Sequence, residues 1–326
     1  MEFKILKTFE LSDNDWKQIV DGFNESFQRN TTKEKLLNLY QFNIFGYSLH
    51  TVCFDNEKIY YFSTIMPLTY LHNNLQEFKT GLSCSTFMLK EYRKDFLSLL
   101  DVIEEVHKEY VKQGYSVILG VPNKNMHKTG NYFFGAKDAG YLPYFSLPLR
   151  FFNVLKKKKL SFLNPIFAFF ASTFCLICKL LSYIFNFKED KAEYRLLINE
   201  DFHKNRFSAP HYQFSQKKNI KFWYRIVEED GIKTAYLMDF REKEIRTNKA
   251  LCTAVWKILR KEKTDIIMFV GTLRVKQFLL FKIPEKYVPK PLPLTYNIIN
   301  SEMKEQFKTM SNLKNWDFSL MNFDAR

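Results

Sequence analysis

The segment KEYRKD at residues 90–95 lies where proteins commonly bind an anion. It follows GLSCSTFML, an apolar run typical of a strand, and precedes an amphipathic run at 96–112 with Leu99, Val102 and Val106 on one face. A strand, a tight turn and a helix in this order bring main-chain amides and the positive end of a helix dipole to one place. The chemistry expected there is the binding of a phosphate or diphosphate group.

The residue types of this segment fit that role only in part. Glycine lets a main chain approach a phosphate closely because it has no Cβ, and residues 90–95 contain no glycine. Asp95 adds a negative charge, which Lys90, Arg93 and Lys94 offset electrostatically. The position therefore favours a phosphate-binding turn, whereas the missing glycines argue against one.

The histidines and cysteines do not form a second motif that indicates a catalytic or metal site. Four histidines have no partner at a motif spacing and favour structural or surface roles: His50, His72, His107 and His127. Cys175 and Cys178 form an isolated CxxC in an apolar run, where packing explains them better than a metal or redox site. Five scattered cysteines and an N-terminus without an apolar core predict a cytoplasmic protein, with no metal site and no disulfide framework.

Composition limits the classes of partner. The chain of 326 residues is 46% hydrophobic and 17% aromatic, which is enough for two cores. Its 49 Lys and Arg exceed its 35 Asp and Glu, and the net charge of +14 favours a polyanionic partner such as a nucleic acid, an anionic membrane or a phosphate-rich small molecule. Most aromatic residues lie in mixed apolar runs such as KIYYFSTIM, where packing explains them better than base stacking. No nucleic-acid partner is therefore expected.

The elements that must position the turn follow from hydrophobic periodicity. In the first half we expect helices at 13–27, 31–42, 96–112 and 131–140, and strands at 48–54, 58–71, 80–89, 115–122 and within 142–155. From residue 193 a weaker version of this order returns, with a hairpin at 222–242, a helix at 247–262, a strand at 264–273, a helix at 274–283 and a strand at 291–299. The chain is therefore expected to be a tandem repeat of one architecture.

The apolar run at 166–187 joins the two halves and follows the lysine run Lys156–Lys159. As a helix its 22 residues would be about 33 Å long, enough to cross a bilayer core. A narrow stripe of small and polar residues argues against a span: Ala168, Ser172, Cys175, Lys179, Ser182 and Asn186. We expect a helix that is buried against both domains or lies in an anionic membrane surface along Lys156–Phe187. The lysine run is equally explained as a solvated linker.

The first half resembles the GNAT N-acetyltransferase superfamily over about residues 3–155. The segments FNESF, YQFNIFGYSLHTVCFDNEKIYYFSTIMPL, STFMLKEYRKDFLSLL, GYSVILGVPN and GAKDAGYLPYFSLPL follow the order of elements in that family. The whole chain is similar to two-domain GNAT proteins of bacterial surface-polysaccharide gene clusters, in which HKNRFSAPHYQF and NWDFSLMNFDAR resemble parts of the second half. The resemblance implies an α/β fold with tandem domains, each a mixed, mostly antiparallel sheet flanked by helices on both faces. The expected divisions are 1–155, 156–192 and 193–326.

The resemblance implies that the turn binds the pyrophosphate of acetyl-CoA, as the family motif Q/R-x-x-G-x-G/A does. Tyr92 and Arg93 match the common "YR" of the family, and Asn123 is expected to face the pantetheine arm. The implied cofactor residues are Phe87, Met88, Tyr92, Arg93, Lys94, Asp95, Phe96 and Asn123. The equivalent turn of the second half also lacks glycine, so we interpret that half as a non-binding or substrate-shaping domain.

Many GNAT enzymes use a tyrosine on the last helix to protonate the departing thiolate. Counting back from Gly140 places Ala136 at that position, and Tyr132, one turn earlier, is the nearest substitute. The alternative for Tyr132 is packing beside Phe133 and Phe134. The resemblance implies acetyl transfer to an amine acceptor, such as an amino sugar of a polysaccharide precursor. The alternative is an inactive GNAT-like scaffold or ligand-binding protein at the inner membrane surface.

Overall fold

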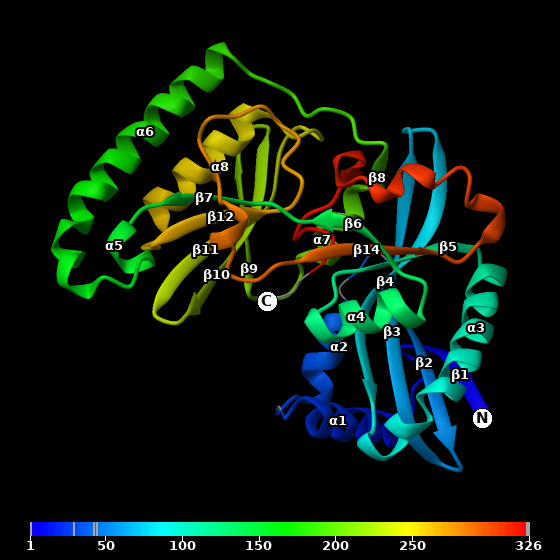
Figure 1. The fold of residues 1–326 in the computed structure, drawn as a ribbon. Helices are drawn as coiled ribbons and strands as arrows, with labels where there is room; N and C mark the ends of the chain where they lie inside the picture. The colour runs from blue at the N-terminus through cyan, green and yellow to red at the C-terminus, as the bar shows by residue number, and fades with distance from the viewer. Residues whose placement is uncertain (1, 29, 42, 44, 324–326) are drawn as a thin grey trace. The chain divides into compact units, whose positions relative to one another are not determined.

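The computed structural model describes residues 2–28, 30–41, 43 and 45–323 and shows two compact units (Figure 1). The first unit consists of Met1–Tyr141, Glu193–Ala209 and Leu292–Trp316, and the second of Leu142–Ala192, Pro210–Pro291 and Asp317–Arg326. Each unit has one mostly antiparallel sheet with helices packed on it. This confirms the expected α/β class with tandem domains.

The sheet of the first unit has the strand order β1-β2-β3-β4-β5-β14-β6. The strands are β1 (Glu2–Lys7), β2 (Leu49–Asp55), β3 (Lys58–His72), β4 (Gln76–Met88), β5 (Tyr115–Gly120), β14 (Pro293–Ile298) and β6 (Lys137–Tyr141). In this order only β4 and β5 are parallel. A short strand, β8 (Tyr194–Leu196), pairs with β3 at its Tyr70–His72 end.

The helices of the first unit form where caps and apolar periodicity agree. They are α1 (Asp13–Phe27), α2 (Lys33–Gln41), α3 (Phe96–Lys112), α4 (Lys124–Phe133) and α7 (Glu200–Arg206), with the 3₁₀ helices η1 (Lys90–Asp95), η4 (Ser301–Met303), η5 (Lys308–Ser311) and η6 (Leu313–Asn315). Helix α1 begins at a capping box, because the Ser12 hydroxyl accepts from the Asp15 amide and the Asp15 carboxylate accepts from the Ser12 amide.

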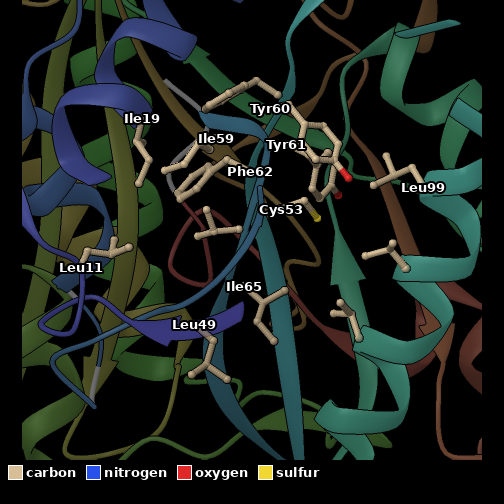
Figure 2. Packing of buried hydrophobic residues seen from close by; sticks show 14 of the residues in the cluster. Leu11, Ile19, Leu49, Cys53, Ile59, Tyr60, Tyr61, Phe62, Ile65 and Leu99 are labelled. Carbon is tan, nitrogen blue, oxygen red and sulfur yellow. The ribbon is translucent and has the colours of Figure 1, made fainter. Parts of the chain in front are cut away.

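The core of the first unit lies on both faces of its sheet (Figure 2). Ile19 of α1 lies on one side of β3, and Leu99 of α3 lies on the other. Trp16 and Ile19 are buried, as the periodicity of residues 13–27 predicts. The two helices therefore fix β3 and β4 between them, and β4 leads into the turn at residues 90–95.

The sheet of the second unit has the strand order β13-β7-β12-β11-β10-β9. The strands are β13 (Phe281–Lys282), β7 (Tyr144–Pro148), β12 (Ile266–Val270), β11 (Ile232–Glu242), β10 (Ile220–Glu229) and β9 (Tyr212–Lys217). The helices are α5 (Phe151–Val154), η2 (Lys158–Leu163), α6 (Asn164–Ile184), α8 (Asn248–Lys261) and η3 (Glu285–Tyr287). The short strand β15 (Trp316–Asp317) lies at the start of the C-terminal segment.

Each half of the chain gives one strand to the sheet of the other. Strand β7 follows β6 along the chain but pairs with β12 and β13. Strand β14 comes from the second half and pairs with β5 and β6. The compact units therefore differ from the contiguous divisions 1–155, 156–192 and 193–326, because the exchanged strands satisfy the edge hydrogen bonds of the opposite sheet.

Two expected helices are wrong. The helix expected at 131–140 is α4 at Lys124–Phe133, and residues 137–141 form β6. Asn123 caps α4 earlier, and Gly135, with φ of 67°, follows its end. No helix is described at 274–283, although Val275 and Leu279 have helical spacing, because both are buried in an irregular segment that leads into β13.

The buried His50 makes the stability of the first unit depend on pH. Its Nδ1 lies 2.8 Å from the Thr64 hydroxyl and its Nε2 lies 3.0 Å from the Thr8 hydroxyl. Burial lowers the pKa of His50 to about 3, from an ordinary value of 6.5. Between these values the unfolded chain binds a proton that the folded chain does not, so the contribution of His50 is present above pH 6.5 and is lost as the pH falls.

We expect His50→Gln to remove up to about 1.4 kcal/mol per pH unit from the slope of unfolding free energy against pH between pH 4 and 6. Urea unfolding at several pH values measures this slope. The matched control is Asn30→Gln, because Asn30 is exposed and carries no titrating group, so its replacement should leave the slope as it is. An unchanged slope in His50→Gln would show that other groups cause the acid sensitivity.

Candidate functional site

Strands β4 and β5 separate at one point of the first sheet. They pair in parallel from Lys79 and Tyr115 up to Ser83 and Gly120, where β5 ends. Strand β4 continues to Met88 and pairs there with β3 alone among the described residues. The last residues of β4 therefore keep an open edge on the side of β5, directly before the turn at residues 90–95.

A β-bulge lies at the same point. Ser83 pairs with Ile65 and Ser85 pairs with Thr64, so Cys84 is the extra residue of β4. The Cys84 thiol donates to the Leu82 carbonyl at 3.1 Å, and burial raises the pKa of Cys84 to about 12. The thiol therefore stays protonated at neutral pH, and the chemical interest of the bulge lies in its main chain rather than in a thiolate.

The turn itself is the 3₁₀ helix η1, which runs directly into α3. In a 3₁₀ helix an amide bonds the carbonyl three residues earlier, as the Tyr92 amide does to the Leu89 carbonyl at 3.1 Å. The Tyr92 amide is therefore used within the chain. Helix α3 begins at Phe96 directly after η1, so the positive end of its dipole lies beside the turn.

The side chains of the turn have separate roles. Tyr92 donates to the Asp55 carboxylate at 2.8 Å and stacks on Tyr60 at 4.6 Å between ring centres, so it holds the turn against the sheet. Arg93 is exposed, and its Nε donates to the Met88 carbonyl at 3.0 Å. Lys94 is exposed beside it. The side chains of Asp95 and Phe96 lie outside the described residues.

Phe87 and Met88 end strand β4 and face different surroundings. Phe87 is buried and packs against Phe23 and Phe62, with ring centres 5.3 and 5.7 Å apart. Its side chain therefore belongs to the core, and only its main chain lies at the open edge of β4. Met88 is half-buried, and its carbonyl is the acceptor of the Arg93 bond.

Helix α4 carries the other two expected site residues. The Asn123 side chain caps α4 by accepting from the amides of Asn125 and Met126 at 3.1 and 3.0 Å. Tyr132 lies in the last turn, three residues before Gly135, and is 83% exposed. The corner between helix and strand is thus Gly135 rather than Gly140, which lies within β6. Gly140 is therefore not the reference point for the last helix, and Ala136 lies after α4 rather than in it.

Two groups near these elements were missed by the sequence analysis. The His127 ring lies 2.7 Å from the Asp138 carboxylate, because the turn after α4 brings β6 back beside it. Tyr40 is fully buried, and its hydroxyl has no hydrogen-bond partner among the described residues. Burial raises the pKa of Tyr40, while the Ser85 and Thr64 side chains lie close enough to lower it. A protonated phenol therefore lies beside the Cys84 bulge, next to these two hydroxyls.

The fold is similar to solved acetyltransferase structures. A GCN5-related N-acetyltransferase from Anabaena variabilis has a TM-score of 0.56 at 10% identity, covering 92% of this chain and 73% of its own. One from Kribbella flavida has a TM-score of 0.56 at 11% identity, with the same coverage. Eis1 from Mycobacterium abscessus has a TM-score of 0.51 at 8% identity, covering 94% and 76%. This chain has the GCN5-related N-acetyltransferase fold. No family model and no curated protein matches its sequence.

The second unit repeats the strand separation of this acetyltransferase fold. Strands β11 and β12 pair in parallel from Thr234 and Ile266 to Tyr236 and Met268, after which β11 continues to Glu242. In this unit the C-terminal segment lies beside the end of β12. The Leu320 amide bonds the Val270 carbonyl at 3.2 Å, and Thr272 bonds the Phe318 main chain.

Gly271 allows this contact. Its φ is 132°, and a Cβ there would lie 2.4 Å from the Phe318 carbonyl oxygen. All of the segment from Asp317 to Phe323 is buried. In the second unit the tail of the chain therefore lies against the strand end that corresponds to the end of β5 in the first.

Buried ion pairs connect the C-terminal tail to strand β11. Asp317 accepts from Arg246 at 2.6 Å, and Asp239 of β11 accepts from Arg246 and Arg241 at 2.8 and 2.7 Å. All four side chains are at most 2% exposed. Burial alone would lower the pKa of Arg246, but the carboxylates of Asp317 and Asp239 more than offset it. Arg241 and Arg246, two basic residues beside the equivalent turn of the second half, are ion-paired inside the unit, whereas Lys243 between them is exposed.

Proposed function

We propose that the first unit transfers the acetyl group of acetyl-CoA to an amine. The observation that carries this proposal is the separation of β4 from β5 at a bulge, directly before a turn and the N-terminus of a 17-residue helix. The acetyltransferase fold supports the reaction class only by analogy. We further propose a cytoplasmic protein whose acceptor is a small amine, such as an amino sugar of a polysaccharide precursor.

The turn at residues 90–95 would bind a diphosphate differently from a glycine-rich turn. The glycine-free turn is a 3₁₀ helix, so its later amides are used internally, but the positive end of the α3 dipole lies beside it. Arg93 and Lys94 are exposed and supply two positive charges there. Acetyl-CoA would supply an activated thioester. The first turn of α3, Arg93 and Lys94 would hold its diphosphate.

We propose roles for two tyrosines of the first unit. The phenol of Tyr132 is exposed, and it would give a proton to a departing thiolate. Tyr40 stays protonated because burial raises its pKa, and its phenol would help to hold the main chain at the Cys84 bulge from inside the core. We name no general base.

The alternative function is a scaffold or ligand-binding protein that does not use acetyl-CoA. The observation that favours it is η1, because a 3₁₀ helix hides amides that a glycine-rich turn would present to a phosphate. The ion-paired arginines and the buried tail of the second unit favour the same interpretation for that unit. We propose that the second unit does not bind acetyl-CoA.

Calorimetry with acetyl-CoA and the full chain distinguishes the two functions. We expect micromolar binding at one site, and we expect the double variant Arg93→Glu/Lys94→Glu to weaken it at least about tenfold, because two cations that neutralise phosphate charge become anions. The matched control is Lys218→Glu/Lys243→Glu in the second unit. Both lysines are exposed and lie close together, because the Lys243 amide donates to the carbonyl of Asn219, the residue after Lys218. Reversing their charges should leave the affinity for acetyl-CoA unchanged. No heat at millimolar acetyl-CoA would support the scaffold.

A further inference from the structure

Helix α6 of the second unit has an inverted amphipathic pattern. Cys175 and Ser182, from its stripe of small and polar residues, are fully buried, and Cys175 belongs to the core cluster of the unit. Helix α6 packs on α8, and Lys179 lies over the Trp256 ring of α8 at 5.1 Å. The polar stripe is therefore the face that packs on the protein, which leaves the apolar face outward.

The outward face consists of large apolar side chains along the whole helix. Phe169, Phe170, Leu180 and Ile184 are 67, 64, 58 and 73% exposed. The segment Lys159–Ile184 is apolar and long enough to cross a membrane, yet only 11% of its most apolar window is buried. A core helix of a soluble domain would be mostly buried. This face therefore needs a partner that is itself apolar.

The charged residues of the α6 segment itself are all positive. No acidic residue occurs between Lys159 and Phe187. Lys157 and Lys159 are exposed at the N-terminal end, where Lys156 pairs with Asp230. At the flank of the helix, burial lowers the pKa of Lys179, and the positive charges of Lys217 and Lys257 lower it further. An apolar strip bordered by lysines complements a surface that is apolar inside and anionic at its edge.

The neighbouring helix decides between lying on a bilayer and crossing one. If α6 crossed the hydrocarbon core, α8 would enter it as well, because the two helices pack along each other. Helix α8 carries exposed charges at Lys257 and Arg260, which are costly in hydrocarbon. A helix lying in the plane of the surface buries only its outward face and leaves α8 in water.

We propose that the second unit docks on an anionic lipid bilayer through the outward face of α6, which lies in the membrane plane with Lys157 and Lys159 at the headgroups. The apolar side chains enter the boundary between headgroups and acyl chains, and the lysines contact the negative surface. This docking is independent of the proposed acetyl transfer, because it uses only residues of the second unit.

Flotation of the full chain with lipid vesicles tests the proposal. We expect the protein to float with vesicles of equal parts phosphatidylcholine and phosphatidylglycerol, and far less with phosphatidylcholine alone. Phe170→Glu and Leu180→Glu should each lower partitioning at least about tenfold. Lys157→Glu/Lys159→Glu should lower partitioning onto the anionic vesicles at least about fivefold per lysine. Added salt should also lower this partitioning, because it screens the attraction.

Matched controls lie in the first unit. Phe9 and Leu75 are 67 and 88% exposed, so Phe9→Glu and Leu75→Glu remove similar apolar groups away from α6. Lys304→Glu removes an exposed lysine there. All three should float as the natural chain does, and thermal unfolding checks that every variant is folded.

Three outcomes would overturn the proposal. One is a protein that stays at the bottom of the gradient with anionic vesicles. Another is resistance to extraction by alkaline carbonate, which would indicate a spanning helix. The third is a dimer in light scattering that Phe170→Glu and Leu180→Glu convert to a monomer while neither form floats, because the face would then be covered by a second copy.

Discussion

Replacing Asp317 with alanine is expected to lower the free energy of unfolding by about 3–5 kcal/mol. The reason is the isolation of a buried cation. Arg246 is fully buried. Its Nη1 donates to the Asp317 carboxylate at 2.6 Å, and its Nε donates to the Asp239 carboxylate at 2.8 Å. Without Asp317, Arg246 loses a carboxylate that accepts from it directly, and it shares Asp239 with Arg241, which leaves positive charge undercompensated in a region of low polarity.

Urea unfolding at neutral pH, followed by circular dichroism, measures this loss. The matched control is Asp230→Ala, which removes a carboxylate that is 79% exposed and pairs with Lys156; its expected effect is below about 1 kcal/mol. A second variant, Asp317→Leu with Arg246→Met, removes the buried pair and should recover much of the stability. A loss for Asp317→Ala no larger than that for Asp230→Ala would contradict the proposed role of the tail.

The same contact explains why the two units of one fold are proposed to differ in function. In the first unit the end of β4 has an open edge beside the exposed Arg93 and Lys94. In the second unit the corresponding strand ends contact the buried tail, and the corresponding arginines are paired with carboxylates. A carboxylate that already neutralises a buried arginine competes with a phosphate for it, so we propose the first unit as the cofactor-binding one.

The sequence predicts the elements whose signals are local. The helices expected at 13–27 and 96–112 have the same ends as α1 and α3, because apolar periodicity and caps act within a few residues. The exchange of β7 and β14 was not predictable in this way. Both segments are clearly strands, but the choice of partner depends on sheet edges that lie more than a hundred residues away.

The candidate site was predictable in place but not in detail. The strand, turn and helix around residues 90–95 lie where the sequence predicts them, whereas the 3₁₀ form of the turn was not predicted from its residue types. Tyr40 gave no signal, because its hydroxyl meets the β4 bulge only after α2 packs on the sheet. His127 and Asp138 are 11 residues apart and meet across a turn.

Tyr132→Phe is expected to lower kcat for acetyl transfer about a hundredfold or more while leaving the affinity for acetyl-CoA unchanged. The change removes one hydroxyl from a side chain that is 83% exposed, so it should not disturb folding. Release of coenzyme A, followed with a thiol reagent and a panel of amino sugars and simple amines, gives kcat and KM. Calorimetry gives the affinity separately.

The comparison with His127→Gln decides which group of α4 supplies the proton. His127 and Tyr132 share one helix, but His127 is paired with Asp138 at 2.7 Å, whereas the Tyr132 ring is exposed. If Tyr132 is the acid, Tyr132→Phe loses turnover and His127→Gln keeps most of it. The reverse result would assign the proton to His127 and make Tyr132 a surface residue. Equal, small losses in both variants would mean that the thiolate leaves without an acid from α4, because its own proton affinity is low enough near neutral pH.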